Sequence, residues 1–197
     1  MRCITTALIC SLTPKLSWTD MQRENIVVPE CYVDTNLMNV LVGKACNHKK
    51  GCTNVCKVLD EKLTDQFAIA VIDKDKKEPA SVQNYELIAA NRFVMVSKHR
   101  QRLHYLIHIC PAIEEFILAA ANELNVNLAD FDLPTDREQL KQKTKTVTAK
   151  EDEKFARLFK ALRPASNIRC LDELLQYLLS GRYNASEEEI RKIISAG

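Results

Sequence analysis

The unbroken apolar run at residues 67–72 constrains the fold more than any other feature, because it ends abruptly in the charged stretch 73–77. Short apolar runs of this kind are typical of strands buried on both faces, as in parallel sheets covered by helices. The β-branched segment 25–28 predicts another buried strand, and residues 93–96 and 103–109 predict two more. The sequence therefore predicts an α/β fold with a mostly parallel sheet and flanking helices.

Three helices are expected around these strands. The first follows Thr35 and ends at Gly43, because glycine is common just past a helix C-terminus. The second carries Leu59 on its apolar face, and the third opens at Pro111. Alternation of strands and helices is the pattern of a layered α/β domain.

The pattern changes to helix alone after Pro134. We expect an α/β domain at residues 25–134 and a small helical appendage at 135–197, joined by a lysine-rich linker at 141–150. Residues 1–24 are expected to be a disordered tail or a wrongly assigned start.

The composition points to a cytoplasmic protein without a membrane partner. The eight cysteines show no regular spacing and several lie in apolar segments, which favours free thiols in a reducing compartment. The apolar run at residues 3–10 is too short to span a bilayer. The four glycines form no phosphate-binding loop, which argues against P-loop and Rossmann nucleotide sites.

Acidic residues follow two of the expected strands. Asp73 and Asp75 come directly after the apolar run, and Glu30 and Asp34 follow the first strand. Ligands of open α/β sheets bind beyond the carboxyl ends of strands, and clustered carboxylates are suited to a hard cation such as Mg²⁺ or Mn²⁺. The pattern predicts a metal site with a carboxylate available as general acid or base. A solvated turn is the alternative interpretation of Asp73 and Asp75.

The segments 30–34 and 72–75 together resemble the Toprim domain of topoisomerases, primases and nucleases of the overcoming-lysogenization-defect type. In that family one strand ends in a glutamate and a later strand ends in Asp-x-Asp. The resemblance implies that Asp73 and Asp75 bind Mg²⁺ and that Glu30 is a general acid or base. This chain has Cys31 where the family usually has glycine after its glutamate.

The same resemblance implies a function and partners. It suggests a Mg²⁺-dependent nuclease or nuclease-like effector that acts on DNA or RNA, in phage defence, with a separate ATPase partner. Asp34 and Glu114 would supply further metal-binding carboxylates. The basic residues expected to contact phosphate are Lys76, Lys98, Arg100 and Arg102.

Two other functions remain open from the sequence. The segment 32–37 is also similar to the opening of PIN-type ribonucleases, in which a strand ends in Asp-Thr-Asn and Asp34 would be the leading metal ligand. Alternatively, the chain is a non-catalytic interaction module that docks through its helical tail.

Further polar residues allow more than one interpretation. The cysteines and histidine of residues 46–56 could form a zinc site. Burial of Cys52 and Cys56 on a helix is the simpler interpretation. His104 and His108 are either structural or close to the metal. The loop Lys49-Lys50 is either a solvated turn or a contact for a nucleic-acid backbone.

Overall fold

The computed structural model describes residues 26–43, 46–74 and 78–197. The strands are β1 (Val27–Pro29), β2 (Ala68–Asp73), β3 (Tyr85–Ala90), β4 (Val94–His99) and β5 (His104–Ile109). The α-helices are α2 (Tyr32–Val42), α3 (Cys52–Glu61), α4 (Ile113–Leu124), α5 (Arg137–Thr144), α6 (Glu153–Leu162), α7 (Ser166–Gly181) and α8 (Glu187–Ala196). Short 3-10 helices are η1 (Ala80–Asn84), η2 (Leu128–Phe131), η3 (Val147–Lys150) and η4 (Arg182–Asn184).

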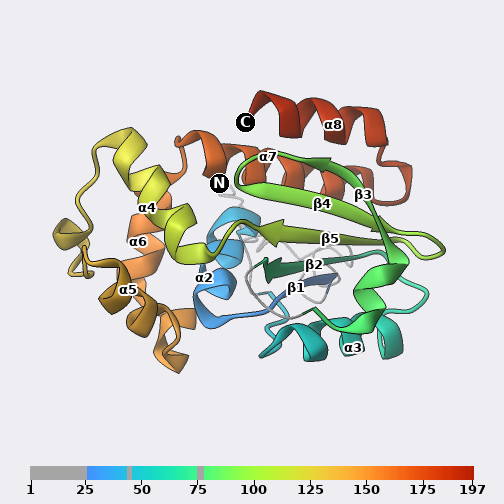
Figure 1. Cartoon of the computed structure of the whole chain (residues 1–197), viewed down its shortest axis with the longest axis horizontal. Helices are drawn as coiled ribbons and strands as arrows, with labels where there is room; N and C mark the ends of the chain where they lie inside the picture. The colour runs from blue at the N-terminus through green and yellow to red at the C-terminus, as the bar shows by residue number, and fades with distance from the viewer. Residues whose placement is uncertain (1–25, 44–45, 75–77) are drawn as a thin grey trace, which may run out of the picture.

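The five strands form one sheet in the order β1-β2-β5-β4-β3 (Figure 1). Strands β1, β2 and β5 run parallel, whereas β4 and β3 are antiparallel to their neighbours. The predicted α/β class is confirmed. The sheet is mixed rather than mostly parallel, because tight connections join β3 to β4 and β4 to β5, and such connections produce antiparallel pairs.

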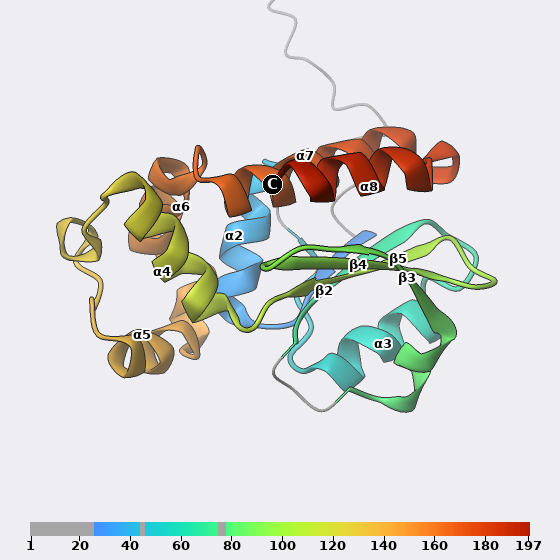
Figure 2. The same cartoon turned by 45° about the horizontal axis from the view of Figure 1, so that its top comes forward.

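Helices cover both faces of the sheet, as the apolar run of β2 predicted. Ile69 and Val71 pack into the larger core cluster, while Ala70 and Ile72 pack into a smaller one. Helix α3 covers the face of the smaller cluster, and α7 and α8 lie on the opposite face (Figure 2). All six residues of β2 are buried, which is why this strand lacks the alternation of a half-exposed one.

Helix α2 begins at Tyr32, three residues before the predicted start at Thr35, and ends at Gly43 as predicted. Its N-cap is Cys31, so Asp34 lies in the first turn of the helix. Gly43 ends the helix in the left-handed conformation with φ 74°, and its N–H bonds to Asn39 O. This conformation favours glycine, so the predicted stop is confirmed.

The segment 135–197 is helical, as expected, and its helices share one hydrophobic cluster with the sheet. Gln176 of α7 donates a hydrogen bond to the Leu41 carbonyl of α2 at 2.9 Å. The buried Asn36 side chain donates to the Ala149 carbonyl at 2.9 Å. The expected linker at 141–150 is not one, because it contains the end of α5 and all of η3, and Ala149 is fully buried.

Strand β3 was not predicted, because it forms one edge of the sheet and exposes much of its surface. The other edge, β1, is bordered by the segment 46–50: Asn47 N–H donates to Val27 O and Lys49 N–H to Pro29 O, each at 3.0 Å. None of the described helices has the length and apolar character needed to cross a membrane. The expectation for residues 1–24 lies outside the described residues.

Candidate metal centre

Glu30 and Asp73 meet at the carboxyl edge of the parallel half of the sheet. β1 and β2 are neighbours in register, with Pro29 opposite Val71. The backbone N–H of Glu30 donates to Val71 O at 3.0 Å, and the Asp73 N–H donates to Glu30 Oε2 at 3.4 Å. The two acidic strand ends are therefore adjacent in the sheet.

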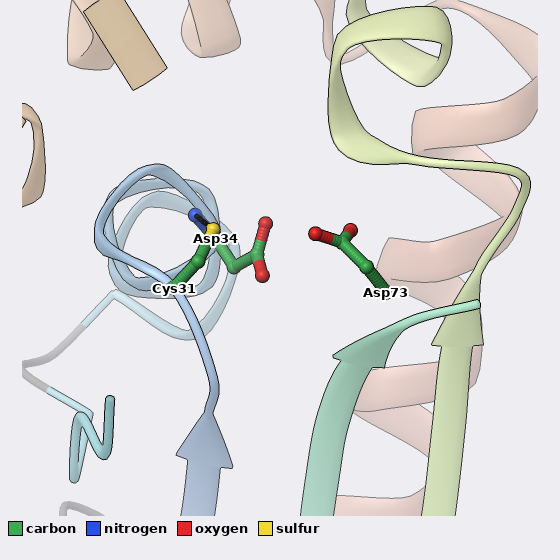
Figure 3. A group of neighbouring side chains, drawn as sticks. All are labelled: Cys31, Asp34 and Asp73. Atoms are coloured by element: carbon green, nitrogen blue, oxygen red, sulfur yellow. Dashed lines mark hydrogen bonds between the residues drawn. The ribbon is translucent and has the colours of Figure 1, made fainter. Parts of the chain in front are cut away.

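Asp34 reaches the same place from helix α2. Candidate ligand atoms of Cys31, Asp34 and Asp73 all lie within 4.8 Å of one another. Figure 3 shows the carboxylates of Asp34 and Asp73 pointing toward each other, with the Cys31 sulfur beside Asp34. Residues from a strand end and a helix start therefore form one compact group.

The β1–α2 turn positions Asp34 through Cys31. The Cys31 Sγ accepts a hydrogen bond from the Asp34 N–H at 3.4 Å, as expected of an N-cap side chain. Thr35 Oγ1 donates to the Cys31 carbonyl at 2.7 Å. Together these contacts fix the first turn of α2, so that Asp34 faces the sheet edge.

Three nearly inaccessible carboxylates meet at this edge. The exposed fractions are 2% for Glu30, 0% for Asp34 and 5% for Asp73. Burial raises the pKa of the Cys31 thiol well above its usual range, and the charges of Asp34 and Asp73 raise it further. Carboxylate oxygens are the donors that Mg²⁺ and Mn²⁺ prefer. The donor set therefore fits a hard divalent cation.

A pocket of about 360 Å³ adjoins this group at Cys31 and Glu30. Its lining residues are Glu30, Cys31, Tyr32, Lys50, Gly51 and Lys145. Lys50 and Lys145 are exposed, so two cationic side chains line the pocket together with Glu30. A phosphate group entering here would meet both charges.

Among the described residues, Glu114 is the predicted acidic residue that is not part of the group. Glu114 is buried in the first turn of α4, where its Oε1 accepts a hydrogen bond from Thr144 Oγ1 at 2.5 Å. It therefore connects α4 to α5. Asp75 and Lys76 lie outside the described residues.

The basic residues of the β4–β5 hairpin lie far from the carboxylates. Ala68, at the start of β2, donates its N–H to Leu103 O, whereas Asp73 is at the other end of that strand. At about 3.3 Å per residue, the two ends of β2 are roughly 17 Å apart. Lys98 pairs with Glu187 at 4.0 Å and Arg102 with Asp60 at 2.7 Å, while Arg100 is exposed.

The remaining candidates have structural contacts. Among the described residues, only Cys31, Asp34 and Asp73 form a group that could hold a metal ion, so the cysteines and histidine of 46–56 do not. Cys52 and Cys56 belong to α3 and are buried in the smaller core cluster, which agrees with the simpler interpretation. His104 Nε2 bonds to the Leu63 carbonyl at 2.9 Å. His108 Nε2 lies 3.0 Å from Glu78 Oε1.

Cys31 is the group member that the sequence did not indicate. The apolar segments around several cysteines favoured free thiols over metal ligands. Its spacing of three residues before Asp34 was an available signal, since an N-cap side chain bonds to the second or third residue of the helix.

Comparisons of the chain with protein-family models, curated proteins and solved structures found no significant match.

Proposed function

We propose that this protein is a divalent-metal-dependent nuclease whose centre is formed by Glu30, Asp34 and Asp73. The observation that carries the proposal is the approach of Asp34 and Asp73 to within 4.8 Å at the carboxyl edge of two parallel strands. Such edges are where open α/β sheets bind their ligands.

Asp34 and Asp73 would hold the cation, with Mg²⁺ or Mn²⁺ as the ion that matches their oxygen atoms. A bound divalent cation neutralises negative charge that develops on a phosphoryl oxygen. Asp34 is held by a helix and Asp73 by a strand, so both carboxylates are already in position before the ion binds. Ion binding therefore need not order these side chains.

Glu30 would be the general acid or base. It lines the pocket, so its carboxylate can exchange a proton with a group bound there. The N–H of Asp73 bonds to Glu30 Oε2 and orients the side chain. The lysines of the same pocket, Lys50 and Lys145, would attract the charge of a phosphodiester.

The arrangement supports the Toprim resemblance more than the PIN resemblance. A glutamate and an aspartate following two adjacent parallel strands agree with the first. The second requires a strand that ends in Asp-Thr-Asn, whereas residues 34–36 belong to helix α2. The Asn36 side chain has a structural role, because it donates hydrogen bonds to the carbonyls of Ala149 and Asp152.

Cleavage of end-labelled DNA and RNA oligonucleotides tests the proposal. We expect Mn²⁺- or Mg²⁺-dependent products with the wild type and none with Asp73→Asn. The control is Glu114→Gln, which changes a buried carboxylate outside the group. Cleavage that persists in Asp73→Asn at the wild-type rate would rule the proposal out.

A further inference from the structure

A strip of lysines adjoins the candidate metal centre. We call it the lysine surface, and its members are Lys49, Lys50, Lys57, Lys62 and Lys145. The first four line a groove of about 400 Å³ along α3, while Lys50 and Lys145 line the pocket of Glu30. Lys50 belongs to both hollows, so the lysine surface reaches the candidate centre.

Most of this charge is not neutralised by the protein. Within the described part of the chain, Lys49, Lys50, Lys62 and Lys145 form no ion pair, and Lys57 has a long contact of 3.9 Å to Glu61. Such an exposed pair has little strength. The net charge of the whole chain is only +2, so attraction of a polyanion depends on local groups of unpaired lysines such as this one.

The lysine surface is elongated and follows helix α3. Lys50 precedes α3 and Lys62 caps its other end, and residues 50, 54, 57 and 61 follow one side of the helix. The ten residues of α3 span about 15 Å. At 3.4 Å per nucleotide of a stacked strand, this length matches about four nucleotides.

An aromatic pair lies between the two hollows. Tyr32 lines the pocket and His48 lines the groove, and their rings stack with centroids 4.8 Å apart. Thr35 Oγ1 donates its hydrogen to the Cys31 carbonyl and lies 2.8 Å from His48 Nδ1. It can therefore accept a hydrogen bond from the Nδ1–H of a neutral His48 ring. Burial lowers the pKa of His48, as do the ammonium groups of Lys150 and Lys49. A neutral, fixed ring pair beside lysines is the arrangement on which unpaired bases stack.

We propose that the lysine surface binds the backbone of a single-stranded nucleic acid and directs the strand to the pocket of Glu30, with a base against Tyr32. This inference rests on the proposed nuclease function and names the path of its substrate. The β4–β5 hairpin is not part of the path, because it lies at the opposite end of β2 from Asp73.

Fluorescence anisotropy with labelled single-stranded DNA and RNA, in the presence of a chelator, tests the inference without cleavage. The test variant is Lys50→Gln/Lys62→Gln, and the matched control is Lys98→Gln/Arg100→Gln, which removes the same charge. We expect affinity to fall roughly tenfold or more in the test variant, and the slope of log K against log salt to become shallower by about 1.4. The control should bind as the wild type does.

A third variant separates stacking from charge. Tyr32→Leu should weaken single-strand binding by about tenfold while leaving the salt slope unchanged, and a duplex of the same sequence should bind more weakly than the single strand. The inference is overturned if the test variant binds like the wild type, if the control loses binding instead, or if only anionic lipid vesicles bind the lysines.

The two proposals fail in different ways. If the protein binds metal but no oligonucleotide, the proposed strand path is wrong and the metal centre is still supported. Lysine-dependent oligonucleotide binding in a protein that binds no metal would support the path and overturn the nuclease. Asp73→Asn should still bind the oligonucleotide in chelator, because the lysine surface does not include the carboxylates.

Discussion

The carboxylate of Asp34 on helix α2 faces the carboxylate of Asp73 at the end of β2, and both side chains are buried (Figure 3). Two parts of the fold produce this contact. The parallel pairing of β1 and β2 brings Asp73 to the edge where β1 ends, and the Cys31 cap turns Asp34 back toward that edge. A cation bound between them would interact with two separate elements, so its binding should stabilise the fold.

The first prediction concerns the class of the ion. Cys31→Ser should leave Mg²⁺ affinity within about threefold, because oxygen is a better donor for this ion than sulfur. It should weaken Cd²⁺ binding, since a soft cation favours thiolate. Serine is also a good N-cap residue, so the free energy of unfolding should be unchanged or higher by up to about 1 kcal/mol. Calorimetry with both ions and urea denaturation check these results, and loss of Mg²⁺ binding would contradict them.

The second prediction separates proton transfer from metal binding. Glu30→Gln keeps the acceptor for the Asp73 N–H but cannot ionise. We expect cleavage to fall by about 10²-fold or more, whereas Mn²⁺ affinity should fall much less. Single-turnover cleavage and calorimetry on the same preparation measure the two effects. Equal losses in both would assign Glu30 to the metal rather than to acid–base chemistry.

The third prediction concerns the C-terminal helices. Because α6 and α7 share the core cluster of the sheet, a fragment that ends at residue 134 should not fold. In the full chain, Leu174→Ala removes a fully buried side chain of α7 and should lower the free energy of unfolding by about 2–5 kcal/mol. Circular dichroism melts test both. A separate, unaffected transition for the α/β part would show that 135–197 is an independent unit.

The fourth prediction concerns pH. Burial lowers the pKa of His104 from 6.5, so the unfolded chain takes up this proton before the folded one does. The stability that neutral His104 contributes is complete above pH 6.5 and is lost as the pH falls below it. His104→Gln should therefore make the decline in stability between pH 6.5 and about pH 5 shallower, by at most about 1.4 kcal/mol per pH unit. An unchanged slope in urea denaturation would contradict this assignment.

The buried parts of the fold were predictable because their sequence signals are local. The apolar run of β2 required helices on both faces, and Gly43 identified the end of α2. The antiparallel half of the sheet was harder to identify. Strand β3 is an exposed edge with weak alternation. The stripes of α6 and α7 do not reveal whether they pack on each other or on the sheet.

The candidate site was predictable to the extent that it depends on strand ends. Glu30 and Asp73 follow from the rule for parallel sheets. The position of the hairpin depends on the register of β2 with β5. The sequence does not contain this register, so it did not show that Lys98, Arg100 and Arg102 lie at the opposite end of β2 from Asp73. Lys145 comes from a segment that was expected to be a linker, and only the tertiary fold brings it to the pocket of Glu30.

Calorimetric titration of the chain with Mn²⁺ and Mg²⁺, comparing wild type, Asp73→Asn and Glu114→Gln, tests the central claim most directly. We expect a saturable binding site in the wild type, its loss in Asp73→Asn, and its retention in Glu114→Gln, because the Glu114 carboxylate accepts a hydrogen bond from Thr144 and is not part of the group. Circular dichroism of each variant ensures that folded proteins are compared. Absence of binding in folded wild-type protein, or binding that survives in Asp73→Asn, would contradict the metal centre.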